Sequence, residues 1–261
     1  MTTEKVRKIS HLQHVLLRPD SYVGSVNRIS DEYWVIEGEK FKLSPVTYSP
    51  ALLKIFDEVL VNALDRNSIH PTETTKIGVT ITDGEISVEN NGPLGGLVIA
   101  KSEEEGLWIP ELTFGHLLTS TNYNDTTDRI VGGRNGYGAK LANIFSTKFS
   151  IKINDGHQCY VQSWSNNMSH VNAPKITKSS LKPSVKISFT PDWEKFGMTT
   201  IDQHFEKIIE KRVWDAVACT SPKCAIWFQG QKIHQLSWES YVKKYITTDA
   251  VATIQSDDGR W

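Results

Sequence analysis

Three stretches of the chain place polar side chains or glycines in patterns that could do chemistry. The first consists of Glu58, Asn62 and Asp65, spaced at i, i+4 and i+7. On a helix, at about 100° per residue, these side chains fall within roughly 60° of one another. A carboxylate there could act as a general base, and the carboxamide oxygen could bind a hard cation. The same pattern is typical of the solvated edge of an amphipathic helix, so both interpretations stay open.

The second stretch is Asn90-Asn91-Gly92, a run that by itself usually indicates a turn. The third is the glycine-rich run 132–140, Gly-Gly-Arg-Asn-Gly-Tyr-Gly-Ala-Lys. Glycines let backbone N–H groups approach an anion, and the N-terminus of a following helix favours negative charge. Taken singly, this run is also consistent with a flexible turn. It is not a Walker loop, because no Ser or Thr follows Lys140. It is not a dinucleotide fingerprint, because Leu141 stands where a third glycine belongs.

Apolar patterns predict the elements that must hold these stretches. Ser49-Pro50 predicts the start of a helix that carries Glu58 and runs to about Asn67. Asp83-Gly84 predicts a hairpin whose second strand ends near Asn90. Further helices are predicted at 112–118, after 140, at 203–213 and at 238–245. A capping box of Thr200 and Gln203 precedes the third of them. Further strands are predicted at 148–154, 157–164, 184–190 and 224–228. This combination indicates an α+β sandwich with helices on one face of a mixed sheet.

Composition limits the classes of protein to consider. The chain has 261 residues, of which 39% are hydrophobic and 23% charged, as in an ordinary globular protein. No segment approaches the roughly 18 apolar residues of a membrane span, and the first residues lack the apolar core of a secretion signal. The three cysteines form no Cys-x-x-Cys pair, which favours reduced thiols and an intracellular protein. The net charge of −1, with no long basic run, argues that this chain does not form the main surface that grips DNA.

Taken in order, the three stretches resemble the signature of the GHKL ATPases. That signature is Glu-x-x-x-Asn on a helix, an Asn or Asp with Gly after a strand, and a glycine-rich loop that opens a helix. Within this superfamily, the runs 16–25, 56–65, 117–123 and 132–149 are similar to eukaryotic-type type IIA DNA topoisomerases, cellular or viral, nearly residue for residue. The resemblance implies a GHKL (Bergerat) ATPase sandwich whose mixed sheet is mostly antiparallel. It places this ATP-binding domain, with an N-terminal arm, at 1–214, and the beginning of a truncated transducer domain at 215–261.

The resemblance also implies roles for particular residues. Glu58 would be the general base that activates water, and Asn62 would bind the Mg²⁺ that accompanies ATP. Asn90 matches the residue that reads adenine. The remaining predicted ATP-binding residues match the lid and the loop around the triphosphate, with Lys140 near the γ-phosphate: Ser120, Thr121, Asn122, Arg134, Asn135, Gly136, Tyr137, Gly138 and Lys140. Positioning and charge stabilisation of this kind suit phosphoryl transfer.

By the same resemblance, ATP binding would pair two such modules into a homodimer in the full-length enzyme and close a gate behind a captured duplex. Duplex DNA would be held mainly by a cleavage core that lies downstream of this chain. The expected location is the nucleus for a cellular enzyme, or the nucleus or a cytoplasmic replication site for a viral one. No membrane partner is expected.

Four departures from the family pattern bear on these roles. Arg66 follows the helix Asp where the family often has Asn. The second glycine of the family's Asn-Asn-Gly-x-Gly pattern is displaced here by one position, to Gly95. Val6 aligns with the Tyr that reaches into the partner subunit, and the Gln-Thr-Lys of the transducer does not occur. Arg66 and the missing transducer lysine leave open a nucleotide-gated dimerisation module without useful hydrolysis. The runs 119–123 and 132–138 disfavour the other GHKL proteins, such as mismatch-repair ATPases, chaperones and histidine kinases.

Overall fold

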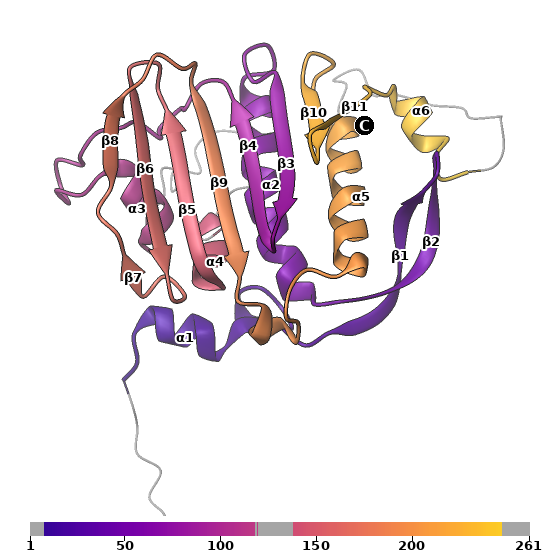
Figure 1. The fold of residues 1–261 in the computed structure, drawn as a ribbon, viewed down its shortest axis with the longest axis horizontal. Coiled ribbons are helices and arrows are strands. Elements are labelled where there is room, and N and C mark those ends of the chain that lie inside the picture. Colours follow the sequence, from indigo (N-terminus) through magenta and orange to yellow (C-terminus); the bar gives the residue numbers. More distant parts are fainter. Residues whose placement is uncertain (1–7, 118, 120–137, 247–261) are drawn as a thin grey trace, which may run out of the picture.

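A nine-stranded sheet forms the centre of the computed structural model, which describes residues 8–117, 119 and 138–246 (Figure 1). In spatial order its strands are β11 (Gln231–Ile233), β10 (Ala225–Phe228), β3 (Lys76–Thr82), β4 (Glu85–Asn91), β9 (Ser184–Pro191), β5 (Ser146–Asn154), β6 (Gln158–Ser165) and β7 (His170–Val171), and β8 (Lys175–Lys178) also pairs with β6. All these pairs are antiparallel except β10 with β3. The predicted α+β fold with a mixed, mostly antiparallel sheet is therefore confirmed.

Helices α2 (Pro50–Ile69), α3 (Ile109–Gly115) and α4 (Gly138–Ile144) lie together on one face of this sheet (Figure 1). Helix α5 (Gln203–Cys219) packs against both α2 and β10. The shorter elements are α1 (His11–Leu17), the 3₁₀ turns η1 (Pro19–Ser21) and η2 (Trp193–Phe196), and α6 (Trp238–Val242). In the part of the chain that is described, no helix combines the length and apolar character needed to cross a bilayer.

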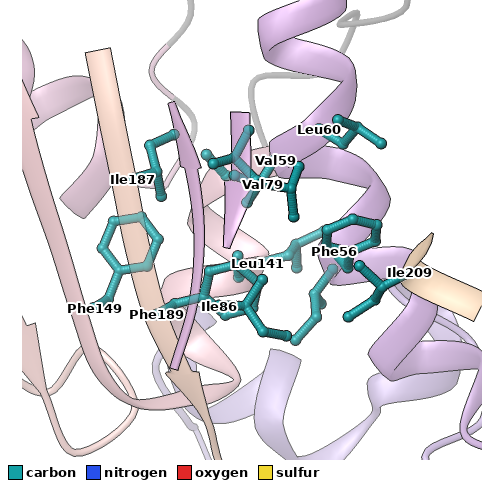
Figure 2. Close-up of a cluster of buried hydrophobic side chains, with 14 of the residues drawn as sticks. Phe56, Val59, Leu60, Val79, Ile86, Leu141, Phe149, Ile187, Phe189 and Ile209 are labelled. Atoms are coloured by element: carbon teal, nitrogen blue, oxygen red, sulfur yellow. The ribbon is translucent and has the colours of Figure 1, made fainter. Parts of the chain in front are cut away.

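Helix α2 forms for the reasons that its sequence suggests, and it carries most of the candidate site. The Ser49 hydroxyl accepts a hydrogen bond from the Leu52 N–H at 3.4 Å, and Pro50 occupies the first turn, where no N–H is needed. Its apolar face is fully buried through Leu52, Ile55, Phe56, Val59, Leu60 and Ala63. Figure 2 shows part of this core, in which α2 meets side chains from β3, β4, β5, β9, α4 and α5. The opposite edge of α2 is thereby held in a fixed position.

A second, two-stranded sheet consists of β1 (Ile29–Glu37) and β2 (Lys40–Tyr48) and was not predicted from the sequence. Most β1 residues are exposed, so the strand lacks a regular alternation of apolar and polar side chains. The hairpin is held by a small separate cluster in which Val35 and Val46 meet Ile208 of α5. This packing depends on a helix more than 150 positions away, which no local pattern in the sequence reveals.

Helix α5 bears on two predictions, the capping box at its start and the domain boundary near its end. The predicted capping box at Thr200 is wrong, because the helix begins at Gln203 with Asp202 as its cap. The Asp202 carboxylate accepts a hydrogen bond from the Phe205 N–H at 2.9 Å, which a Thr200 side chain three residues from Gln203 does not do. The predicted domain boundary between residues 214 and 215 falls inside α5, and β10 and β11 beyond it join the same sheet. The division into two domains stays a prediction.

Candidate functional site

Glu58 lies at the contact between α2 and α4, with 23% of its side chain exposed. Its Oε1 atom is 2.5 Å from the Lys54 ammonium, one helical turn earlier. Its Oε2 atom lies so close to Gly138, the first residue of α4, that a Cβ on Gly138 would collide with it. Glu58 and Gly138, predicted from two separate stretches, are therefore in direct contact. A carboxylate held in this way can accept a proton from a water molecule bound beside it.

Lys140 lies two residues further along α4 and is 2% exposed. Its ammonium donates a hydrogen bond to the backbone carbonyl of Thr119, the residue just before the predicted lid residues. Burial lowers the pKa of Lys140 to about 8, because the charged form loses its hydration. The structure thus places a buried lysine two residues after Gly138, at the end of the glycine-rich run, and its role near the γ-phosphate stays a prediction.

Asn62 follows Glu58 by one turn of α2 and is half-buried. No hydrogen bond of its carboxamide is found within the described residues, so Oδ1 has a free acceptor site there. The described residues also contain no cluster of three His, Cys, Asp or Glu side chains suited to a metal. A single carboxamide oxygen, that of Asn62, fits Mg²⁺, which usually takes only one or two protein oxygens and completes its coordination shell with phosphates and water. It does not fit zinc, which prefers three or four nitrogen and sulfur ligands.

Asn90 is buried, at 6% exposure, near the end of β4, the strand on which α2 packs. Its neighbour Asn91 fixes the following turn: its Oδ1 accepts from the N–H groups of Thr75 at 2.9 Å and Lys76 at 2.8 Å. Gly92 has a φ of 106°, and a Cβ there would collide with Thr74. The turn that follows Asn90 is therefore hydrogen-bonded to and closely packed against the entry to β3. This places Asn90 at a defined position beside α2.

Seven of the predicted ATP-binding residues lie outside the described part of the chain, and so does Val6. The seven are Ser120, Thr121, Asn122, Arg134, Asn135, Gly136 and Tyr137. Their roles stay predictions. The predicted residues that the structure does describe, from Glu58 to Lys140, come from α2, β4 and α4 and lie on neighbouring elements.

A network of charged side chains anchors α2 one residue before Glu58. Arg212 of α5 contacts Asp57 of α2 at 2.8 Å and Asp215 at 3.2 Å. Asp215 also accepts hydrogen bonds from Lys211 and the Tyr241 hydroxyl, both at 2.5 Å. Burial raises the pKa of Asp57, and Arg212 opposes that rise. The network ties α5 and α6 to the helix that carries the candidate base.

Three contributors to the site were not predicted from the sequence. Lys54 pairs with Glu58 at i, i+4, a spacing that could have been recognised as a helical ion pair. Asn91 shapes the turn after Asn90, and nothing in the sequence indicates that its carboxamide accepts hydrogen bonds from two backbone N–H groups at the entry to β3. The Thr119 carbonyl is a backbone group, and no sequence pattern identifies its partner. These residues orient the predicted ones.

Relatives of the chain were found among curated proteins and solved structures, although no protein-family model matches it. It is 42% identical over 98% of its length to DNA topoisomerase 2 of Penicillium chrysogenum, and 40% identical over 94% to that of Arabidopsis thaliana. The chain spans only 16% and 17% of the length of these two curated relatives.

Two solved structures show the same fold. The ATPase region of Saccharomyces cerevisiae topoisomerase II superimposes with a TM-score of 0.87 at 40% identity, covering 92% of this chain and 64% of the other. The ATPase and transducer domains of DNA topoisomerase II from Balamuthia mandrillaris superimpose with a TM-score of 0.88 at 37% identity, covering 94% of this chain and 64% of the other. Identity at this level over nearly the whole chain establishes homology, and the resemblance predicted from the three sequence stretches is confirmed.

Proposed function

We propose that this chain, a homologue of the ATPase region of DNA topoisomerase II, is the ATP-binding and ATP-hydrolysing gate module of a type IIA DNA topoisomerase. The observation that carries the proposal is the contact between Glu58 and Gly138 beside Lys140, at residues that match this family. ATP binding would join two such modules, hydrolysis would reset them, and duplex DNA would pass through the gate. Duplex DNA would be held by parts of the enzyme beyond this chain. Such a module would act in the nucleus, or at the replication site of a virus.

The described residues divide the work of hydrolysis among them. Asn90 hydrogen-bonds the adenine. Asn62 would hold Mg²⁺ through its carboxamide oxygen, and the metal, when bound, would supply positive charge that offsets the charge of the triphosphate. Glu58 accepts a proton from the water molecule whose oxygen attacks the γ-phosphorus. The bond between that phosphorus and the β–γ bridging oxygen breaks, and ADP leaves with the bond's electron pair. Lys140 stabilises the charge that develops on the phosphoryl oxygens.

Lys54 orients the base in this scheme. Its contact at 2.5 Å engages Oε1 of Glu58, so Oε2 is the oxygen that faces α4 and the glycine-rich run. The Asp57–Arg212 contact at 2.8 Å ties the same turn of α2 to α5. The Lys54 contact restrains the carboxylate and the Arg212 contact restrains its helix, which suits a reaction that depends on positioning.

The test compares residues 1–261 with a protein extended at its C-terminus through the transducer. The 261-residue chain should bind ATP weakly, stay largely monomeric with a non-hydrolysable analogue, and barely turn over. The extended protein should hydrolyse ATP at least about tenfold faster, because loss of a γ-phosphate contact costs on the order of 10²–10³ in rate. Its activity should rise more than linearly with protein concentration, as a dimerising module requires.

Two results would count against the proposal in different ways. If neither protein binds ATP, the chain is not a nucleotide-binding module. If the two proteins have equal specific activity, the described domain suffices for hydrolysis, and the role assigned to the second domain is wrong.

A further inference from the structure

Arg66 and Gly95, two of the departures from the family pattern, contact each other in the structure. Arg66 lies in the last turn of α2, and Gly95 lies in the loop after β4 with a φ of 60°. A Cβ on Gly95 would collide with Nη1 of Arg66 and would lie 3.2 Å from its Cζ. The guanidinium therefore rests on the backbone of the loop, where only a glycine lets it approach so closely. The displaced glycine and the unusual arginine form one unit.

The guanidinium of Arg66 has no acceptor in the part of the chain that is described. Neither a hydrogen bond nor an ion pair is found there for its five N–H donors, although the residue is half-buried. Arg28 and Arg212, by contrast, contact Asp202 at 2.5 Å and Asp57 at 2.8 Å. Burial lowers the pKa of Arg66 and the neighbouring Asp65 opposes this, but an arginine keeps its charge in proteins. A half-buried cation without an acceptor favours an anionic ligand.

The position of Arg66 indicates which part of a nucleotide this ligand group would be. Arg66 follows Glu58 by eight residues, which is about 12 Å along the helix axis. Its backbone carbonyl accepts a hydrogen bond from the Thr74 hydroxyl at 3.3 Å, and Thr74 lies against Gly92. Arg66 is therefore at the end of α2 near Asn90, the residue assigned to adenine. Glu58, the candidate base that would meet the γ-phosphate, lies near the middle of α2, about two turns earlier.

We propose that the Arg66 guanidinium, seated on Gly95, binds the phosphate closest to the ribose of a nucleotide. The planar guanidinium presents parallel N–H donors that match two phosphate oxygens. Because that phosphate is common to ATP and ADP, Arg66 holds both nucleotides equally and takes no part in the chemical step. The proposal rests on the proposed nucleotide-binding function and adds a contact that a neutral residue at position 66 does not make.

The test measures ATP and ADP affinities of the 261-residue chain by calorimetry. Arg66→Gln should weaken both nucleotides by the same factor, about tenfold or more, as expected for a lost hydrogen bond to a charged group. Arg66→Lys should recover part of that loss, since it restores the charge without the planar donors. Lys175→Gln removes an exposed positive charge from β8 at the far edge of the sheet and should change neither affinity. Lys140→Met should weaken ATP more than ADP.

A double substitution tests whether Gly95 acts through Arg66. Gly95→Ala forces the guanidinium to move and should weaken both nucleotides by itself. In the Arg66→Gln background, Gly95→Ala should cost much less affinity, because the displaced contact is already gone. Urea unfolding of every variant confirms that affinities are compared between folded proteins.

The outcomes separate this proposal from the proposed function. If the parent chain binds ATP and ADP and Arg66→Gln binds both equally well, the Arg66 contact is wrong and nucleotide binding stands. If Arg66→Gln weakens ATP alone, the guanidinium contacts the terminal phosphate, and the assignment to the ribose end is wrong. Additive effects of Arg66→Gln and Gly95→Ala would show that the two residues do not act as one unit. If the parent binds neither nucleotide, both proposals fail.

Discussion

The carboxylate of Glu58 lies against Gly138 so closely that no side chain larger than hydrogen fits between them. Glu58 belongs to α2 and Gly138 begins α4, so the contact joins the helix of the candidate base to the end of the glycine-rich run. The position of the base therefore depends on a glycine 80 residues later in the chain. This dependence can be measured in the rate of hydrolysis, because displacing a catalytic group by about 1 Å can cost 10²-fold in rate.

Gly138→Ala should lower single-turnover ATP hydrolysis by about 10²-fold in a protein extended through the transducer, since the new methyl group displaces Oε2 of Glu58. ATP affinity should change much less, because the base does not hold the nucleotide. The matched control is Gly78→Ala, where an added Cβ would meet only the Trp227 Cβ at an ordinary 3.8 Å. Hydrolysis that stays at the parent rate in Gly138→Ala would mean that this contact does not position the base.

Asn62→Ala should reduce ATP affinity in the presence of Mg²⁺ by roughly tenfold or more, because even residues behind metal ligands have effects of that size. Affinity in EDTA should change little, since Asn62 acts through the metal. Calorimetric titrations with and without Mg²⁺ give both values for the parent and the variant. The metal assignment is wrong if the two conditions respond to the substitution alike.

ATP affinity should fall as the pH rises through about 8, because burial lowers the pKa of Lys140 to about that value. Below this pH the ammonium is charged and attracts the triphosphate, and above it the neutral amine does not. The fall should approach tenfold per pH unit for the loss of one coupled proton. Lys140→Met should bind ATP more weakly and lack this dependence, which separates it from titration of ATP. A parent profile that matches the variant's between pH 7 and 9 would contradict the role of Lys140.

Arg212→Gln should lower the free energy of unfolding by about 1–3 kcal/mol at pH 7, because Asp57 and Asp215 lose a partly buried cation. Burial already raises the pKa of Asp57, and losing Arg212 raises it further. Asp57 then takes up a proton in the folded variant as the pH falls, so the difference from the parent should narrow toward pH 5. Lys42→Gln breaks the exposed Glu37–Lys42 pair and is the control, with no measurable effect expected. Equal stability of Arg212→Gln and the parent in urea would show that this network does not anchor α2.

The parts of the fold that were predicted correctly depend on local patterns. The Ser49-Pro50 start and the apolar face of α2 are contained in one helix, and Asp83-Gly84 forms the turn between β3 and β4. Sheet order and the β1–β2 hairpin depend on contacts between distant residues. The parallel pairing of β10 with β3, for example, joins Ile226 to Ile77 across almost 150 residues. Nothing in either strand alone specifies that partner.

The candidate site was predicted as far as its residues carry a motif. Glu58, Gly138 and Lys140 were identified from the family resemblance, and the structure brings Glu58 and Gly138 into contact. The supporting groups could not be predicted in the same way. The Thr119 carbonyl that meets Lys140 is part of the backbone, and the contact of Gly95 with Arg66 combines two positions where the chain leaves the family pattern. Their roles follow from geometry alone.

The most direct test of the account is Glu58→Gln in a protein extended through the transducer. The amide keeps the size of the side chain but cannot accept the proton of the attacking water, so hydrolysis should be lost. Nucleotide affinity should stay close to that of the parent, because most contacts to ATP remain. The measurement pairs calorimetric ATP affinity with single-turnover hydrolysis. Retained affinity without hydrolysis is the predicted result, and full hydrolysis by the variant would exclude Glu58 as the base.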